Sequence, residues 1–187
     1  RSLLLSSEIA SLYLQPFPVS DTAVFLGRQK AWLESGAIAW EFVQSHSDGW
    51  EALLEQLVST SWESITDCCG LSREELEHTA ARLANCRAVV FAWAMGITHH
   101  SNGTNNVQAI ANSAVLSGNV GRPGAGTMPI RGHSNVQGFG SMGVSVRLRE
   151  PMRLALEAVL KRPLSRIPGF HARDLIEAAD RGEVDAL

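Results

Sequence analysis

A short run of β-branched and aromatic residues, RAVVFAW at positions 87–93, constrains the fold most, because helical patterns flank it on both sides. A nearly continuous apolar run of this length is typical of a buried strand in a parallel sheet. Before it, Ser72 and Glu75 form a capping-box pattern that predicts a helix through Asn85, and residues 105–116 predict a helix after it. The order helix, buried strand, turn, helix is the pattern of an α/β protein.

Four residues come directly after this predicted strand: Met95, Gly96, Thr98 and His99. In open α/β sheets, ligands bind just beyond the carboxyl ends of the strands. We therefore expect these four residues to contribute to a ligand site, and this expectation depends on the pattern alone.

A second feature is the stretch 118–143, GNVGRPGAGTMPIRGHSNVQGFGSMG, which holds half of the 16 glycines. Glycine lets the backbone approach a ligand closely, and backbone N–H groups beside arginine favour an anionic ligand such as a phosphate-bearing cofactor. The stretch has no carboxylate, and its polar side chains are donors and amides, namely Arg122, Arg131, His133, Ser134, Asn135 and Gln137. A flexible linker is the alternative, but it would be richer in Ser and poorer in Met, Ile, Val and Phe. The composition favours a binding loop.

The runs WAMGITHHSNG (93–103) and NVGRPGAGTMPIRGHSNVQG (119–138), and the spacing between them, resemble the molybdopterin oxidoreductases of the dimethyl sulfoxide reductase family. The branch of formate-dehydrogenase-like alpha subunits matches best, and weaker similarity extends over nearly the whole chain. The resemblance implies a helix-rich α/β fold, a Rossmann-like three-layer αβα arrangement with a mainly parallel sheet. Residues 1–131 would be the end part of one such domain, and residues 132–187 the beginning of a second α/β cofactor-binding segment.

The resemblance also implies a cofactor, molybdopterin guanine dinucleotide with molybdenum (or tungsten). Its contacts would come from the four residues after the predicted strand and from a second group, Gly132, Ser134, Asn135 and Gln137. In this family, the cysteines of the 4Fe-4S cluster and the protein ligand of the metal belong to upstream sequence. No metal ligand is therefore predicted within this chain, and the chain alone should be catalytically incompetent.

Arg131 is the first candidate catalytic residue, because an arginine is always charged and donates two parallel hydrogen bonds to a carboxylate or phosphate. It matches the family arginine that lies beside the metal and orients the substrate; an ion pair with a nearby acid is the structural alternative. His133 is the second candidate. At His133 and at His99, formate dehydrogenases commonly have Gln, which puts formate in doubt as the substrate more than it does the cofactor. Both histidines could instead be structural.

Other functions stay open or are disfavoured. A non-catalytic phosphate- or nucleotide-binding module, or a degenerate paralogue of the same family, is the alternative to an enzyme. A nicotinamide-binding domain is disfavoured, because GRPGAG at 121–126 follows a predicted helix where that motif requires a strand.

Composition bounds the rest. The chain has 187 residues, 45% hydrophobic content and a net charge of −3, which is typical of a folded chain, and no basic run predicts a nucleic-acid partner. The apolar stretch 87–96 is too short to span a bilayer, and no signal peptide is evident, so we expect no membrane insertion and a cytoplasmic location. The first residue is not Met, which together with the resemblance predicts a piece of a larger polypeptide. The expected partners are the remainder of that polypeptide, a small-molecule substrate and an electron-transfer subunit.

Local patterns predict the remaining elements. Asp21 is a predicted N-cap for a helix to residue 35, with Gly36 just past its end. The other predicted helices are 37–44, 50–58, 62–69, 151–162 and 172–181, and a strand is predicted to begin at 184–187. Cys68, Cys69 and Cys86 lack metal-site spacing and are interpreted as reduced packing residues.

Overall fold

A computed structural model describes residues 10–184, which divide into two compact units with the boundary between Gly132 and His133. The assignment of residues 1–131 and 132–187 to particular cofactor-binding domains stays a prediction. The strand expected at 184–187 falls almost entirely outside the described residues. No helix in the described part of the chain is both long enough and apolar enough to cross a membrane.

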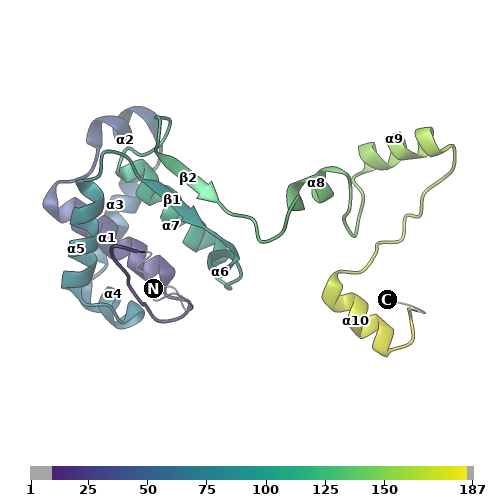
Figure 1. The fold of residues 1–187 in the computed structure, drawn as a ribbon, viewed down its shortest axis with the longest axis horizontal. Helices are drawn as coiled ribbons and strands as arrows, with labels where there is room; N and C mark the ends of the chain where they lie inside the picture. The colour runs from purple at the N-terminus through teal and green to yellow at the C-terminus, as the bar shows by residue number, and fades with distance from the viewer. Residues whose placement is uncertain (1–9, 185–187) are drawn as a thin grey trace. The chain divides into compact units, whose positions relative to one another are not determined.

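The first unit is helix-rich and carries a small parallel sheet (Figure 1). Helix α1 lies at its centre and packs against α3, α4, α5 and α7. Strands β1 and β2 pair in parallel, so the predicted α/β class with a parallel sheet is confirmed. The elements in chain order are α1 (Asp21–Ser35), α2 (Trp40–His46), α3 (Trp50–Ser59), α4 (Trp62–Cys69), α5 (Arg73–Ala84), β1 (Val90–Trp93), α6 (Met95–Thr98), α7 (Gly103–Leu116) and β2 (Gly126–Pro129).

Most helix boundaries follow the local signals. The capping box of Ser72 and Glu75 is present at the start of α5, and Gly36 ends α1 with φ 72°. Asp21 is not the N-cap of α1 but its first helical residue. The N-cap is Ser20, whose carbonyl accepts hydrogen bonds from the N–H groups of Ala23 and Val24. The helix predicted at 37–44 starts later, because the N–H of Ala39 donates to Leu116 O at 2.8 Å and holds residues 37–39 outside the helix.

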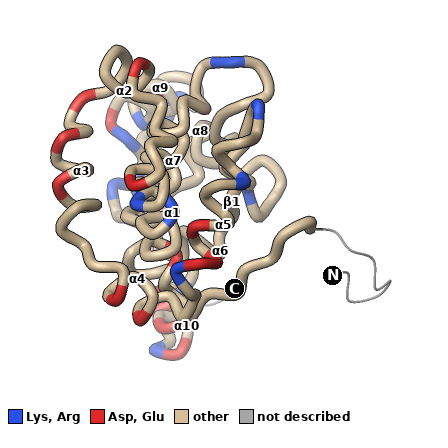
Figure 2. Tube along the Cα trace, turned by 90° about the vertical axis from the view of Figure 1, so that its left-hand side faces the viewer, with Lys and Arg blue, Asp and Glu red and all other residues tan. Residues whose placement is uncertain are grey.

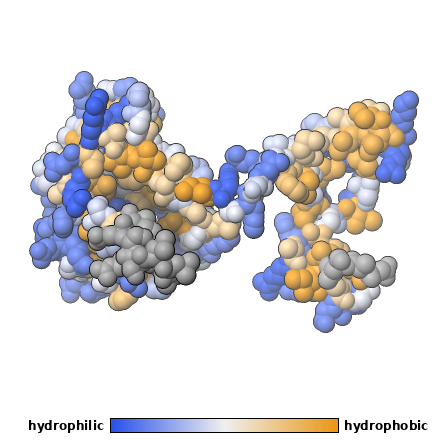
Figure 3. Space-filling view, in the orientation of Figure 1, coloured by the Kyte–Doolittle hydropathy of each residue, from blue (hydrophilic) through white to orange (hydrophobic). Residues whose placement is uncertain are grey.

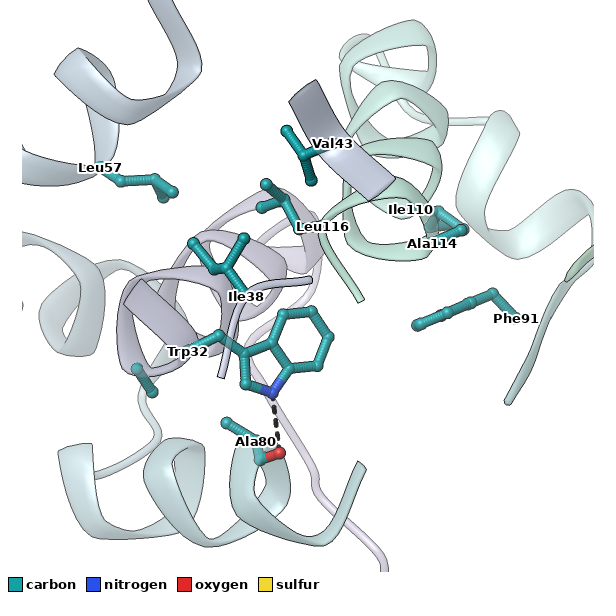
Figure 4. Close-up of a cluster of buried hydrophobic side chains, with 10 residues drawn as sticks. Trp32, Ile38, Val43, Leu57, Ala80, Phe91, Ile110, Ala114 and Leu116 are labelled. Atoms are coloured by element: carbon teal, nitrogen blue, oxygen red, sulfur yellow. Dashed lines mark hydrogen bonds between the residues drawn. The ribbon is translucent and has the colours of Figure 1, made fainter. Parts of the chain in front are cut away.

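The core of the first unit is built around Trp32 on α1 (Figure 4). Its indole Nε1 donates to the carbonyl of Ala80 on α5 at 2.8 Å, so the one polar atom of a fully buried side chain is satisfied. Burying such a ring contributes on the order of 3 kcal/mol. The buried residues around Trp32 come from several helices and from β1: Ala31, Ile38, Val43, Leu57, Ala80, Phe91, Ile110, Ala114 and Leu116.

Strand β1 differs from its prediction in length and burial. It begins at Val90 rather than residue 87, and only Phe91 is fully buried. Side chains alternate between the two faces of a strand, so Phe91 enters the core while Val90, 49% exposed, lies on the opposite face. A second difference is that the stretch 118–143, predicted as a loop, contains β2 and the short helix α8 (Val136–Ser141).

The cysteine prediction is partly wrong. All three cysteines are free, but only Cys69 is buried, whereas Cys68 and Cys86 are exposed. Adjacent helical residues point about 100° apart, so Cys68 cannot share the buried side of α4 with Cys69. Burial raises the pKa of the Cys69 thiol.

The second unit contains α8, α9 (Glu150–Leu160) and α10 (Ala172–Asp180), and the two longer helices match their predictions to within two residues. The guanidinium of Arg153 is buried between the carboxylates of Glu150 and Glu157. Large apolar side chains stay exposed on this unit, which appears as orange over α9 and α10 in Figure 3. They include Leu154, Val159, Leu160, Ile167 and Ile176.

Candidate functional site

The two strands of the first unit end side by side. Their parallel register pairs Val90 with Gly126 and Trp93 with Pro129, and the N–H of Ile130 donates to Trp93 O at 2.7 Å. The chain therefore leaves both strands at the same edge of the sheet. Six residues predicted for the site belong to these two exits and are all exposed. We call them the strand-end surface: Met95, Gly96, Thr98, His99, Arg131 and Gly132.

The two exits lie against each other at one point. A Cβ built on Gly132 would stand 2.4 Å from Cε and 2.7 Å from Sδ of Met95, so any larger residue would displace the end of that side chain. Gly96 is different, because a Cβ there would meet nothing within 4 Å. Gly96 thus keeps an open, side-chain-free position on the strand-end surface, where a ligand could approach the backbone closely.

The turn after β1 is tightly closed. It contains the single-turn helix α6, in which the N–H of His99 donates to Met95 O at 2.9 Å. At Gly103, the first residue of α7, a Cβ would stand 2.4 Å from the carbonyl oxygen of Thr98. The backbone of Thr98 therefore approaches α7 more closely than any side-chain-bearing residue at position 103 would permit.

Acidic residues are missing from a longer interval than the stretch 118–143 described above. No Asp or Glu occurs between Glu77 and Glu150, whereas this interval contains six arginines. Figure 2 shows Asp and Glu in red along α3, α4 and α5. Within the described residues no carboxylate forms an ion pair with Arg131, so the structural alternative for this arginine finds no partner there. The strand-end surface is suited to a negatively charged ligand.

The remaining predicted residues, His133, Ser134, Asn135 and Gln137, belong to the second unit, and all four are exposed. Asn135 precedes α8 with φ 58°, and its amide lies so close to Gly138 that a Cβ there would stand 2.0 Å from Asn135 Oδ1. A side chain at position 138 would therefore displace the Asn135 amide. Among residues 10–184, no group of three His, Cys, Asp or Glu side chains is arranged to hold a metal ion.

Sequence reasoning missed Asn106, a fully buried residue that bonds the turn after β1 to α1 and α7. A signal was present in the sequence. Asn106 shares the buried side of α7 with Ala109, Ile110 and Ser113, at the spacing of one helical face. An amide at an otherwise small or apolar buried position requires partners for its polar atoms.

Comparison with known proteins aligns this chain with part of several longer proteins. It is 32% identical over 189 residues to the probable oxidoreductase YjgC of Bacillus subtilis, covering 97% of this chain and 19% of that protein. It is 33% identical over 134 residues to the alpha subunit of F420-dependent formate dehydrogenase 1 of Methanococcus maripaludis, covering 72% of this chain and 20% of the subunit. The chain thus spans about a fifth of the length of these curated relatives.

A solved structure shares the fold. Acetylene hydratase from Pelobacter acetylenicus superposes with a TM-score of 0.58 at 20% identity, over 62% of this chain and 16% of that one. No family model matches the chain. The oxidoreductase names of these relatives agree with the molybdopterin oxidoreductase family that the sequence motifs indicated, whereas the acetylene hydratase structure supports the fold alone. They select no branch within the family.

Proposed function

We propose that this chain is the central portion of a molybdopterin-dependent, formate-dehydrogenase-like oxidoreductase. In this proposal the strand-end surface of the first unit binds molybdopterin guanine dinucleotide, and Ser134, Asn135 and Gln137 are further cofactor contacts that the family resemblance implies. The observation that carries the proposal is the parallel register of β1 and β2, because it delivers both motif-bearing segments to one edge of the sheet. Ligand sites of α/β folds occupy that edge.

The residues present fit such a cofactor. The cofactor carries phosphates, and the segment that would receive them has arginines and no acidic side chain. Gly96 offers an open backbone position, and the exposed side chains of Thr98 and His99 add a hydroxyl and an imidazole able to hydrogen-bond polar ring edges. The metal held by the cofactor would supply two-electron redox chemistry when bound.

Arg131 and His133 would carry the substrate-directed roles. The Arg131 guanidinium is exposed and has no carboxylate partner in the described residues, so both edges of its fork are available to an oxyanion substrate. His133 would donate or accept a hydrogen bond toward the substrate through its exposed imidazole ring. A 4Fe-4S cluster, an electron-transfer partner and a cytoplasmic location belong to the same proposal and concern the longer polypeptide.

The role of Arg131 is tested by Arg131→Lys in the full-length parent enzyme, which keeps the charge but loses the paired donors. Turnover should fall about tenfold or more while molybdenum per chain stays near wild type, because one positioned donor pair is lost at the reacting end of the substrate. Arg82→Lys on α5, also exposed, is the matched control and should leave both values unchanged. Unaltered kinetics in Arg131→Lys would remove this arginine from the mechanism.

A further inference from the structure

The buried amide of Asn106 connects three elements of the first unit. Its Oδ1 accepts from the hydroxyl of Thr22 on α1 at 2.6 Å and from Asn102 Nδ2 at 3.3 Å. Its Nδ2 donates to the carbonyl of Ile97 on α6 at 3.0 Å. The side chain is 0% exposed, so water cannot replace these partners.

The orientation of this amide follows from its partners. The Ile97 carbonyl can only accept a hydrogen bond, so the atom that faces it must be the donor nitrogen. The other end of the amide then accepts from Thr22 and Asn102. The carbonyls in the last turn of a helix have no partner within the helix, and α6 is only one turn long, so Asn106 supplies what the Ile97 carbonyl lacks.

Two neighbours of Asn106, Asn102 and His100, link the same turn to the residues at the start of α1. Asn102 Nδ2 also reaches the carbonyl of Val19 at 3.4 Å, and Val19 has a φ of 69°, which is strained for a β-branched residue. His100 Nδ1 lies 3.4 Å from Asn106 Nδ2 and 3.6 Å from a carboxylate oxygen of Asp21. The segment before α1 is thereby linked to the turn between α6 and α7.

We propose that Asn106 is a positioning residue that sets the conformation of the turn at 95–103 and, through it, the cofactor contacts of Met95, Gly96, Thr98 and His99. The cofactor part rests on the function proposed above. Asn106 is buried, so it acts on a ligand only through the turn, by its contacts with Ile97, His100 and Asn102. Without its amide, the Ile97 carbonyl loses its donor and the turn is free to open.

The test compares two buried amides of the α1–α7 interface in the full-length protein. Asn106→Leu removes the amide that contacts the turn. Gln29→Met is the matched control, because Gln29 is also 0% exposed and donates to Ala109 O and Ser113 Oγ, both at 2.8 Å, but does not contact the turn. Each variant replaces a buried amide by an apolar side chain of similar size.

Two quantities are measured: amide hydrogen exchange at 97–103 in cofactor-free protein, and pterin retained per chain after prolonged dialysis of loaded protein. In Asn106→Leu, exchange at 97–103 should rise about tenfold or more, as expected when a buried carbonyl loses its partner, and pterin should be lost correspondingly faster. Gln29→Met should raise the exchange rate at 109–113. It should leave the exchange rate at 97–103 and the pterin retention within about twofold of wild type.

Unchanged exchange at 97–103 in Asn106→Leu, or equally fast pterin loss from Gln29→Met, would overturn the positioning role. If Asn106→Leu does not fold, the pair Thr22→Val and Thr22→Ser replaces it: only the valine variant loses the donor to Asn106 Oδ1, and only it should loosen the turn. A wild-type protein that holds no pterin would refute the proposed function, and the exchange measurement would still decide whether Asn106 controls the turn.

Discussion

The side chain of Met95 lies against Gly132, with Cε where a Cβ on that glycine would come within 2.4 Å. The two residues are far apart in sequence, and each follows the end of one strand of the parallel pair. This contact joins the two segments whose motifs indicated a cofactor. It also shows that the glycine at position 132 serves the packing of a neighbouring side chain.

Two glycine substitutions should therefore have different effects. At Gly132, an alanine Cβ meets the flexible end of Met95, which can move aside, so we expect the fold to lose less than about 1 kcal/mol. At Gly103, it meets the backbone oxygen and carbon of Thr98, at 2.4 and 2.9 Å, and overpacking against backbone costs about 1–3 kcal/mol. Native-state hydrogen exchange of α7 in the full-length protein would measure both.

The amount of pterin retained should also distinguish the two variants. Gly132→Ala displaces Met95 on the strand-end surface, so pterin should be lost faster although α7 stays protected. Equal loss of α7 protection in Gly103→Ala and Gly132→Ala would contradict the packing described here.

The start of α5 should depend on acid pH. Glu75 accepts from the backbone N–H and the hydroxyl of Ser72, at 2.8 and 2.9 Å, and these bonds hold the pKa of its carboxyl below the usual 4.5. A carboxyl group whose pKa is lower in the folded than in the unfolded state stabilises the fold at pH values above its unfolded pKa. This stabilisation is lost as the pH falls through the folded pKa. We therefore compare the hydrogen-exchange protection factors of the α5 amides in wild type and in Glu75→Gln. The ratio of wild type to variant should exceed one at pH 6 and fall toward one below about pH 4.5.

Glu74→Gln, which removes the adjacent carboxylate, is the control. The ratio of α5 protection factors between wild type and Glu74→Gln should not change with pH. A ratio between wild type and Glu75→Gln that stays constant with pH would show that the capping carboxylate contributes nothing in its charged form.

The three cysteines should differ in reactivity. Cys68 and Cys86 are exposed, whereas Cys69 is buried and its pKa is raised by burial, so both access and thiolate fraction are reduced there. With a thiol-alkylating reagent at pH 8, Cys68 and Cys86 should be modified at least about tenfold faster than Cys69, as peptide mass spectrometry would resolve. The difference should vanish in denaturant. Equal native rates at Cys68 and Cys69 would place both on the exposed side of α4.

Local signals in the sequence were sufficient where short-range chemistry decides the structure. The capping box of Ser72 and Glu75 and the left-handed Gly36 follow from hydrogen bonds and sterics within a few residues. The parallel strand was also predictable in kind, because its apolar run lies between helices. Its partner β2 was not, since Gly126–Pro129 contains a glycine and a proline, residues that disfavour strands.

In the candidate site, too, residues marked by local motifs were predictable and a residue that depends on tertiary contacts was not. The motif residues were found because glycines, arginines and their spacing are visible in the sequence. Asn106 was missed because its importance depends on tertiary contacts, with Thr22 on α1 lying 84 positions away. The burial of β1 was overestimated because apolar composition does not say which face of a strand is covered.

The central claim is tested most directly by metal and pterin analysis of the full-length parent protein, purified from a host that makes the cofactor. We expect molybdenum or tungsten together with two pterin dinucleotides per chain. A clean, folded preparation containing neither metal nor pterin would contradict it. The strand-end surface would then belong to a phosphate- or nucleotide-binding module without redox chemistry.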